Sequence, residues 1–148
     1  MAASRADSPW PARKGRILIV DDEEGMRDLL KAILEADYHI AEADSGAALH
    51  QALDKEAPDV VLLDMKLPDA NGLGLLRAIK QRRPATEVVM LSGRPNDPGA
   101  ASWAAEAVKD GAFACLPKSA EFSFPQILNS VSSALEHRCQ AQGSTHDA

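Results

Sequence analysis

Cysteine is scarce in this 148-residue chain, and its scarcity limits the class of protein. The two cysteines, Cys115 and Cys139, do not form a CxxC pair and are too few for a disulfide framework. A small secreted scaffold stapled by disulfides is therefore excluded. We expect a reduced protein of the cytoplasm.

Long apolar runs and an excess of basic residues are missing as well. The longest apolar stretches, such as ILIV and VVLL, have the length of a strand, which is far too short to span a bilayer. Lys and Arg number 16 against 22 Asp and Glu, and the resulting net charge of −6 argues against a nucleic-acid-binding surface. We expect neither a membrane nor a nucleic acid as a direct partner.

What the chain does contain is an alternation of strand-like runs and helical patterns. We predict a flexible leader at residues 1–15, a folded domain at 16–137 and a flexible tail at 138–148. Ser45 is expected to cap one helix and Gly111 to stop another. Five strands are predicted, each followed by a helix, at residues 16–20, 39–43, 59–64, 87–91 and 112–116.

The first, third and fourth of these strands are apolar at every position. Continuous apolar strands are typical of a parallel sheet that helices cover on both faces. Five βα units joined by right-handed crossovers predict a doubly wound α/β sheet. In such folds, ligands bind beyond the carboxyl ends of the strands.

Polar residues stand at these carboxyl ends. Asp21 and Asp22 follow the first strand, Asp64 ends the third, Ser92 follows the fourth and Lys118 follows the fifth. Three neighbouring carboxylates repel one another, and a hard divalent cation such as Mg²⁺ relieves the repulsion. A lysine suits a phosphoryl oxygen, and a carboxylate can itself accept a phosphoryl group. The pattern therefore indicates phosphoryl chemistry.

Each residue alone also has an ordinary structural explanation. Asp21 could be the N-cap of the first helix, Ser92 a loop residue bonded to a backbone N–H, and Lys118 a surface lysine. Asp44, after the second strand, is interpreted as a capping or solvent-facing residue and not as a fourth ligand. The functional interpretation is favoured because five such residues would otherwise coincide at one edge.

Four motifs occur in order: ILIVDDE, VVLLDMKLPDANG, VVMLSG and GAFACLPK. Together they resemble the receiver domain of two-component response regulators, of the CheY-like, NtrC type, over about residues 16–137. The expected fold is then a flavodoxin-like (βα)5 sandwich whose five-stranded parallel sheet has the order 2-1-3-4-5. Pro68 and Gly72 match the turn that follows the phosphorylation site in this family.

The resemblance implies a role for each residue at the edge. Asp64 matches the phosphoacceptor, which is also a Mg²⁺ ligand. Asp21 and Asp22 match the acidic pair that holds Mg²⁺, with Asp22 the more direct ligand. The backbone carbonyl of Lys66 matches a further Mg²⁺ ligand. Two more residues match groups that bind the phosphoryl oxygens, namely Ser92 and Lys118.

The resemblance also implies partners. The phosphoryl group would come from a sensor histidine kinase, from a phosphotransfer protein or from a small phosphodonor. A downstream protein would bind the face made by the fourth helix, fifth strand and fifth helix, where a homodimer is also possible. The domain would be no enzyme beyond catalysing its own phosphorylation and dephosphorylation.

Three features depart from the family pattern. Cys115 stands where an aromatic switch residue is usual, and we interpret it as a small buried apolar residue. Ser119 replaces a proline that is usually cis, so we expect either a trans bond with a shifted loop or strain. The link around residues 93–99 is longer than usual. Trp103 beyond it could anchor a partner or pack against its own loop.

Two basic residues lie two positions after the expected site residues Asp64 and Ser92. We hypothesise that these residues, Lys66 and Arg94, cover the phosphoryl group and set its lifetime. Lys66 also argues against a phosphatase of the haloacid dehalogenase type, because that class requires an aspartate at this position. The acidic first loop argues against a flavin-binding protein of similar topology.

The alternative function is a degenerate receiver that acts as a phosphate-independent protein-interaction module. Cys115 and Ser119 favour this alternative, whereas the complete acidic cluster opposes it. No helix-turn-helix and no P-loop motif is present in the sequence. The chain could be a single-domain regulator or the receiver piece of a longer protein.

Overall fold

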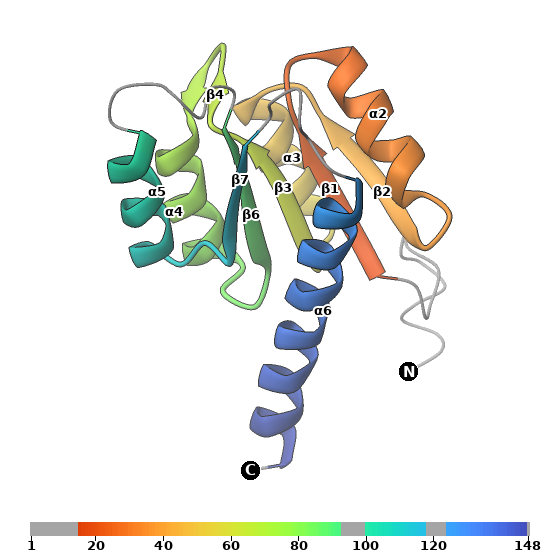
Figure 1. The fold of residues 1–148 in the computed structure, drawn as a ribbon. Coiled ribbons are helices and arrows are strands. Elements are labelled where there is room, and N and C mark those ends of the chain that lie inside the picture. The colour runs from red at the N-terminus through yellow and green to blue at the C-terminus, as the bar shows by residue number, and fades with distance from the viewer. Residues whose placement is uncertain (1–14, 93–99, 118–123, 148) are drawn as a thin grey trace.

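The computed structural model describes residues 15–92, 100–117 and 124–147, and Figure 1 shows the arrangement of their helices and strands. The elements in chain order are β1 (Gly15–Val20), α2 (Glu24–Leu34), β2 (Tyr38–Ala43), α3 (Gly46–Lys55), β3 (Val60–Asp64), β4 (Lys66–Leu67), β5 (Ala70–Asn71), α4 (Gly72–Arg82), β6 (Glu87–Ser92), α5 (Ala100–Lys109), β7 (Ala114–Pro117) and α6 (Phe124–Asp147).

Five of the strands form one parallel sheet in the order β2-β1-β3-β6-β7. This is the predicted order 2-1-3-4-5, because β4 and β5 pair with each other in a separate antiparallel ribbon. Helices α2 and α6 cover one face of the sheet, and α3, α4 and α5 cover the other (Figure 1). The doubly wound α/β fold is therefore confirmed.

Two apolar layers explain why the central strands are apolar at every position. Leu18, Val20, Val61 and Leu63 point into the layer beneath α3, α4 and α5. The alternate residues of the same strands, such as Ile17 and Leu62, point into the layer beneath α2 and α6. Because successive side chains of a strand point to opposite faces, both faces need apolar residues.

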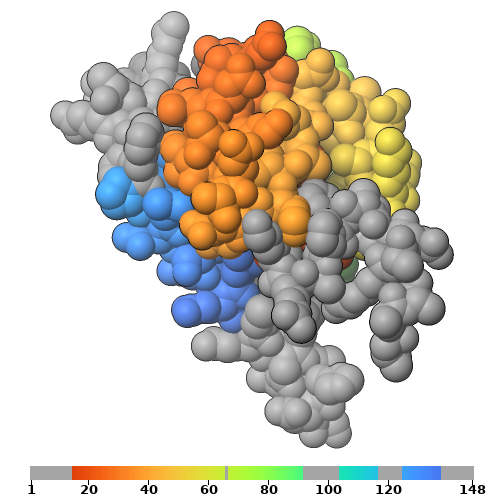
Figure 2. Space-filling model, turned by 90° about the vertical axis from the view of Figure 1, so that its right-hand side faces the viewer, coloured from red at the N-terminus to blue at the C-terminus, as the bar shows by residue number. Residues whose placement is uncertain are grey.

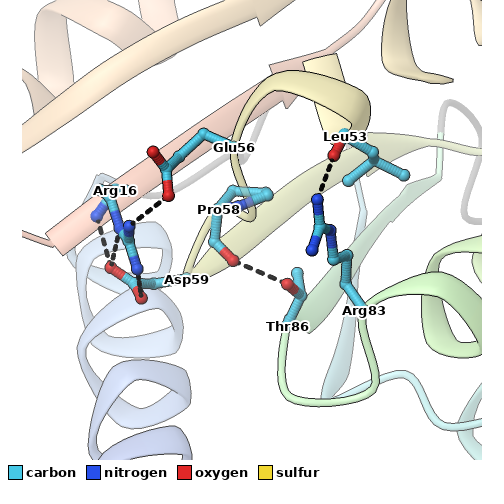
Figure 3. Close-up of polar contacts among 7 residues, drawn as sticks. All are labelled: Arg16, Leu53, Glu56, Pro58, Asp59, Arg83 and Thr86. Carbon is cyan, nitrogen blue, oxygen red and sulfur yellow. Dashed lines mark hydrogen bonds and ion pairs between the residues drawn. The ribbon is translucent and has the colours of Figure 1, made fainter. Parts of the chain in front are cut away.

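Charged groups tie the amino ends of the strands together (Figure 3). Asp59, just before β3, accepts hydrogen bonds from the backbone N–H, Nε and Nη2 of Arg16 on β1 at 2.9, 3.2 and 3.1 Å. Glu56 accepts from Nη1 of the same arginine at 3.2 Å. Buried Thr86 donates its hydroxyl to the carbonyl of Pro58 at 2.7 Å. This edge is held by matched donors and acceptors.

Two elements differ from the prediction. The β4–β5 ribbon was not predicted, because two-residue strands leave no periodic pattern. The last helix was expected to stop before the predicted tail at 138–148, whereas α6 continues to Asp147. The added segment contains no proline, which is the residue that most strongly ends a helix. The division of the chain into leader, domain and tail stays a prediction.

The stop at Gly111 is confirmed, since α5 ends at Lys109 and Gly111 adopts a φ of +109°. Among the described residues, no helix combines the length and the apolar character needed to cross a membrane.

Candidate metal centre

Three carboxylates converge at the carboxyl edge of the sheet. The register of the parallel strands places Val20 beside Leu63, so the residues that follow, Asp21 and Asp64, come to the same level. One carboxylate oxygen each from Asp21, Asp22 and Asp64 lies within 4.8 Å of the others. Asp21 is fully buried and Asp64 is 5% exposed, whereas Asp22 is exposed. The predicted cluster is confirmed as a geometric feature.

Asp21 is held through its backbone and its side chain. Its N–H donates to the carbonyl of Ala43 on β2 at 3.1 Å, and its Oδ1 accepts from the N–H of Glu23 at 2.9 Å. The N-cap residue of α2 is Glu23, which makes no side-chain cap hydrogen bond. Asp21 is therefore not the N-cap, although its side chain orders the turn that leads into the helix.

The backbone after Asp64 is supported from two sides. The N–H of Met65 donates to the carbonyl of Leu91 on β6 at 2.9 Å, and the N–H of Gly72 donates to the carbonyl of Met65 at 2.9 Å. A Cβ atom on Gly72 would lie 2.8 Å from both the Cα and the carbonyl oxygen of Met65. The predicted turn residue Gly72 thus allows α4 to begin directly against the strand that presents Asp64.

A further carboxylate, Asp69, was not predicted to have a role. Its Oδ1 and Oδ2 accept hydrogen bonds from the N–H groups of Gly46 and Ala47, at 2.8 and 3.0 Å. These two bonds lower the pKa of Asp69 below its ordinary value. Ser45 is confirmed as the N-cap of α3, because its hydroxyl accepts from the N–H of Ala48 at 3.1 Å. Since Asp69 is 23 residues from Gly46, local sequence carried no signal of this contact.

The remaining predicted site residues are placed only in part. Ser92 ends β6, and its Cα pairs with that of Pro117 at the end of β7. Lys118 comes next in the sequence and lies outside the described residues. The backbone of Lys66 lies in β4, directly after the strand that ends at Asp64. Asp44 is exposed and does not belong to the carboxylate cluster, in agreement with the prediction.

Some of the residues that depart from the family pattern also lie outside the residues that the structure describes. Arg94, Ser119 and the long link at 93–99 lie outside the described residues, as does the side chain of Trp103 on α5. Cys115 is half-buried on β7 and packs against the layer beneath α3, α4 and α5. Its burial raises the pKa of the thiol, which disfavours the reactive thiolate. This supports the interpretation of Cys115 as a small core residue.

The chemistry of the cluster fits a hard divalent cation. All of its candidate ligand atoms are carboxylate oxygens, which Mg²⁺ prefers, and no histidine or cysteine belongs to this group of described residues. Mg²⁺ keeps several waters when it binds through one or two carboxylates. The exposed position of Asp22 leaves the cluster open to solvent on that side.

Comparison with known proteins gives one consistent result. The model of the response regulator receiver domain matches residues 17–132. The chain is 32% identical over 131 residues to the DNA-binding transcriptional regulator NtrC of Escherichia coli K12, covering 88% of this chain and 27% of that protein. It is 38% identical over 108 residues to a protein-glutamate methylesterase/protein-glutamine glutaminase of Agrobacterium fabrum, covering 71% of this chain and 30% of that protein.

Solved structures show the same likeness. NtrX from Brucella abortus superposes with a TM-score of 0.82 at 29% identity, over 92% of this chain and 30% of that chain. A receiver domain protein from Clostridium thermocellum superposes with a TM-score of 0.76 at 28% identity, over 86% of this chain and 98% of that chain. The chain therefore spans about a quarter to a third of the longer relatives and nearly the whole of the shorter one.

Proposed function

The chain belongs to the response regulator receiver domain family, and on that premise we propose that it accepts a phosphoryl group on Asp64 in the presence of Mg²⁺. The observation that carries this proposal is the approach of the oxygens of Asp21, Asp22 and Asp64 to within 4.8 Å at the end of two adjacent strands. The sheet is rigid there, because both strands are paired on both sides.

The transfer is a displacement at phosphorus. An Asp64 oxygen forms the new P–O bond as the P–N bond of a donor phosphohistidine breaks, and the imidazole nitrogen takes the bonding electron pair. A proton from solvent then completes the neutral imidazole. Asp64 as a residue is 5% exposed, and the cluster is open to solvent on the side of the exposed Asp22. When bound, Mg²⁺ supplies positive charge that offsets the carboxylates and the phosphoryl oxygens. Asp21, Asp22 and Asp64 would hold it, with the backbone carbonyl of Lys66.

Two further residues are proposed to bind the phosphoryl oxygens. The backbone pairing of Ser92 with Pro117 supports this role, because it brings Ser92 close to the residue that precedes Lys118. The hydroxyl of Ser92 would donate a hydrogen bond, and the ammonium of Lys118 would contribute charge. Lys66 and Arg94 remain candidates for setting the phosphoryl lifetime.

The partners we propose are a histidine kinase or phosphotransfer protein upstream and a protein effector downstream. The predicted output face consists of α5, β7 and α6. A homodimer through this face is a second use of the same surface. We place the domain in the cytoplasm, where a kinase has access to ATP.

Intact-mass spectrometry tests the proposal directly. The wild type would be incubated with a small-molecule phosphodonor and Mg²⁺, beside an Asp64→Asn variant and a sample containing a chelator. One phosphoryl group should add to the wild type and to neither control. An adduct that persists in Asp64→Asn would place the phosphoacceptor elsewhere. The absence of both an adduct and Mg²⁺ binding would favour the phosphate-independent interaction module.

A further inference from the structure

Arg27 links the loop that carries the acidic pair to the neighbouring strand. Arg27 lies on α2, and its side chain is 16% exposed. Its Nη1 donates to the backbone carbonyl of Asp21 at 2.7 Å, and its Nε donates to Oε1 of Glu42 on β2 at 3.3 Å. Helix α2 and strand β2 lie side by side on the face shown in Figure 2. One guanidinium therefore spans α2, the loop after β1, and β2.

The bond to the carbonyl of Asp21 has a consequence for Asp22. A peptide unit is planar, so the direction of the Asp21 carbonyl also sets the N–H and the Cα of Asp22. Asp21 is also held through its N–H, which donates to Ala43, and through its Oδ1, which accepts from Glu23, and the bond from Arg27 adds a contact to the carbonyl oxygen itself. Asp22 itself is exposed and projects from this peptide.

We propose that Arg27 is a positioning residue, which holds the Asp21–Asp22 peptide in the orientation that lets both carboxylates meet one cation with Asp64. This inference rests on the proposed function, because it concerns the affinity of the same metal centre. A guanidinium can donate from two nitrogens in a fixed fork, which a lysine ammonium cannot reproduce. Groups that orient metal ligands typically change metal affinity by about 10- to 100-fold when removed.

The competing explanation is that Arg27 only forms an ion pair with Glu42. Glu42 is 34% exposed at its side chain and also lies 4.0 Å from Nζ of Lys31. Partly exposed ion pairs of this kind contribute little to stability. A Glu42→Gln variant weakens the ion pair and leaves the bond from Arg27 to the Asp21 carbonyl, so it separates the two explanations.

Calorimetric titration with Mg²⁺ tests the proposal on the whole chain. Arg27→Ala should raise the Kd for Mg²⁺ about tenfold. Arg27→Lys should raise it by a smaller factor, and this variant replaces Arg27→Ala in the test if the alanine variant does not fold. Glu42→Gln should bind Mg²⁺ as the wild type does. The control is Arg77→Ala. Arg77 on α4 likewise bridges two acceptors through its guanidinium, the carboxylates of Glu106 on α5 and of Asp110 just beyond it, both at 2.8 Å.

Two further measurements distinguish positioning from general loosening of the fold. The amide resonances of Asp22 and Glu23 in metal-free protein should shift in Arg27→Ala and stay in place in Arg77→Ala. Phosphorylation of Arg27→Ala should return close to the wild-type level when Mg²⁺ is saturating. Equal Mg²⁺ affinity of the Arg27 variants and the wild type would overturn the role of Arg27 alone. A wild type without Mg²⁺ affinity would overturn the proposed function together with this inference.

Discussion

One aspartate precedes strand β3 and another ends it. The two side chains are buried to a similar extent but have different partners. Asp59, just before the strand, is 8% exposed and accepts three hydrogen bonds from Arg16. Asp64, its last residue, is 5% exposed and lies with Asp21 and Asp22. One carboxylate meets a cation of the chain itself, and the other meets two more carboxylates.

The difference separates a structural edge of the sheet from a functional one. At the amino edge, charges are matched within the chain: Glu87, for example, contacts Lys80 and His137. At the carboxyl edge, three carboxylates of the described residues gather, and a bound cation would relieve the repulsion among them. Such unfavourable gathering is typical of a site kept for a ligand.

Breaking the amino edge should have the largest effect on stability. Asp59→Ala removes the acceptor of three bonds from Arg16, so the free energy of unfolding should fall by about 2–3 kcal/mol. Urea unfolding measures this free energy.

Glu56→Ala removes the second, more exposed partner of the same arginine and should lower the free energy of unfolding by less than about 1 kcal/mol. Both variants should keep wild-type Mg²⁺ affinity; a large loss in Asp59→Ala would show that the two edges are not separable.

Two glycine variants test whether the backbone beside Asp64 requires a glycine at position 72. Gly72→Ala forces a Cβ to within 2.8 Å of the Met65 backbone, and should lower the free energy of unfolding by about 2 kcal/mol. In Gly74→Ala, two residues further along α4, the added Cβ has no neighbouring atom within 4 Å. This substitution should raise the free energy of unfolding by about 0.5–1 kcal/mol. Thermal unfolding of both variants is the measurement. Equal effects of the two substitutions would remove the argument that Gly72 supports the backbone beside Asp64.

Removing one charge from the cluster should stabilise the metal-free protein. Asp22→Asn relieves repulsion with Asp21 and Asp64, and should raise the free energy of unfolding by about 1 kcal/mol in a chelator. In the wild type, Mg²⁺ at a hundredfold excess over its Kd should add about 2.7 kcal/mol, and Asp22→Asn should lose most of that gain. Asp44→Asn, an exposed carboxylate outside the cluster, is the control and should change neither value.

The smallest effect is expected at Asp69, and it depends on pH. Because the folded state lowers the pKa of Asp69, its contribution to stability is present above the ordinary value of 3.8 and disappears as the pH falls through the lowered value. Asp69→Asn should therefore be less stable than the wild type at neutral pH, and the difference should shrink in acid. Urea unfolding across this range measures it. A difference in the free energy of unfolding that grows as the pH falls would contradict this prediction.

Much of the fold followed from local patterns. The apolar runs of β1, β3 and β6 are contiguous in sequence, as are the aspartates that follow β1 and end β3, so the doubly wound sheet and the cluster of Asp21, Asp22 and Asp64 could be predicted. The strand order followed from the resemblance to the receiver domain. The Asn71 cap of α4, whose Oδ1 accepts from the N–H of Leu73 at 2.7 Å, is also local but lay in a segment expected to be a simple turn.

What escaped prediction depends on contacts between distant segments. Asp69 accepts from N–H groups at the start of α3, more than twenty residues earlier, and Arg27 joins Asp21 to Glu42 on β2, which is 15 residues away from it. Neither contact has a signature in composition or periodicity. Ten residues of α6 beyond His137 likewise lacked the apolar spacing by which the rest of that helix was recognised.

The central claim is that the two ends of β3 differ in kind, and a Mg²⁺ titration followed by backbone amide resonances tests it most directly. The account predicts that the resonances of Asp21, Asp22, Asp64 and Met65 shift on saturation, while those of Arg16 and Asp59 stay in place. The same titration of Asp64→Asn should show weaker binding. Shifts confined to the amino edge, or none at either edge, would contradict the assignment of the carboxyl edge as the metal centre.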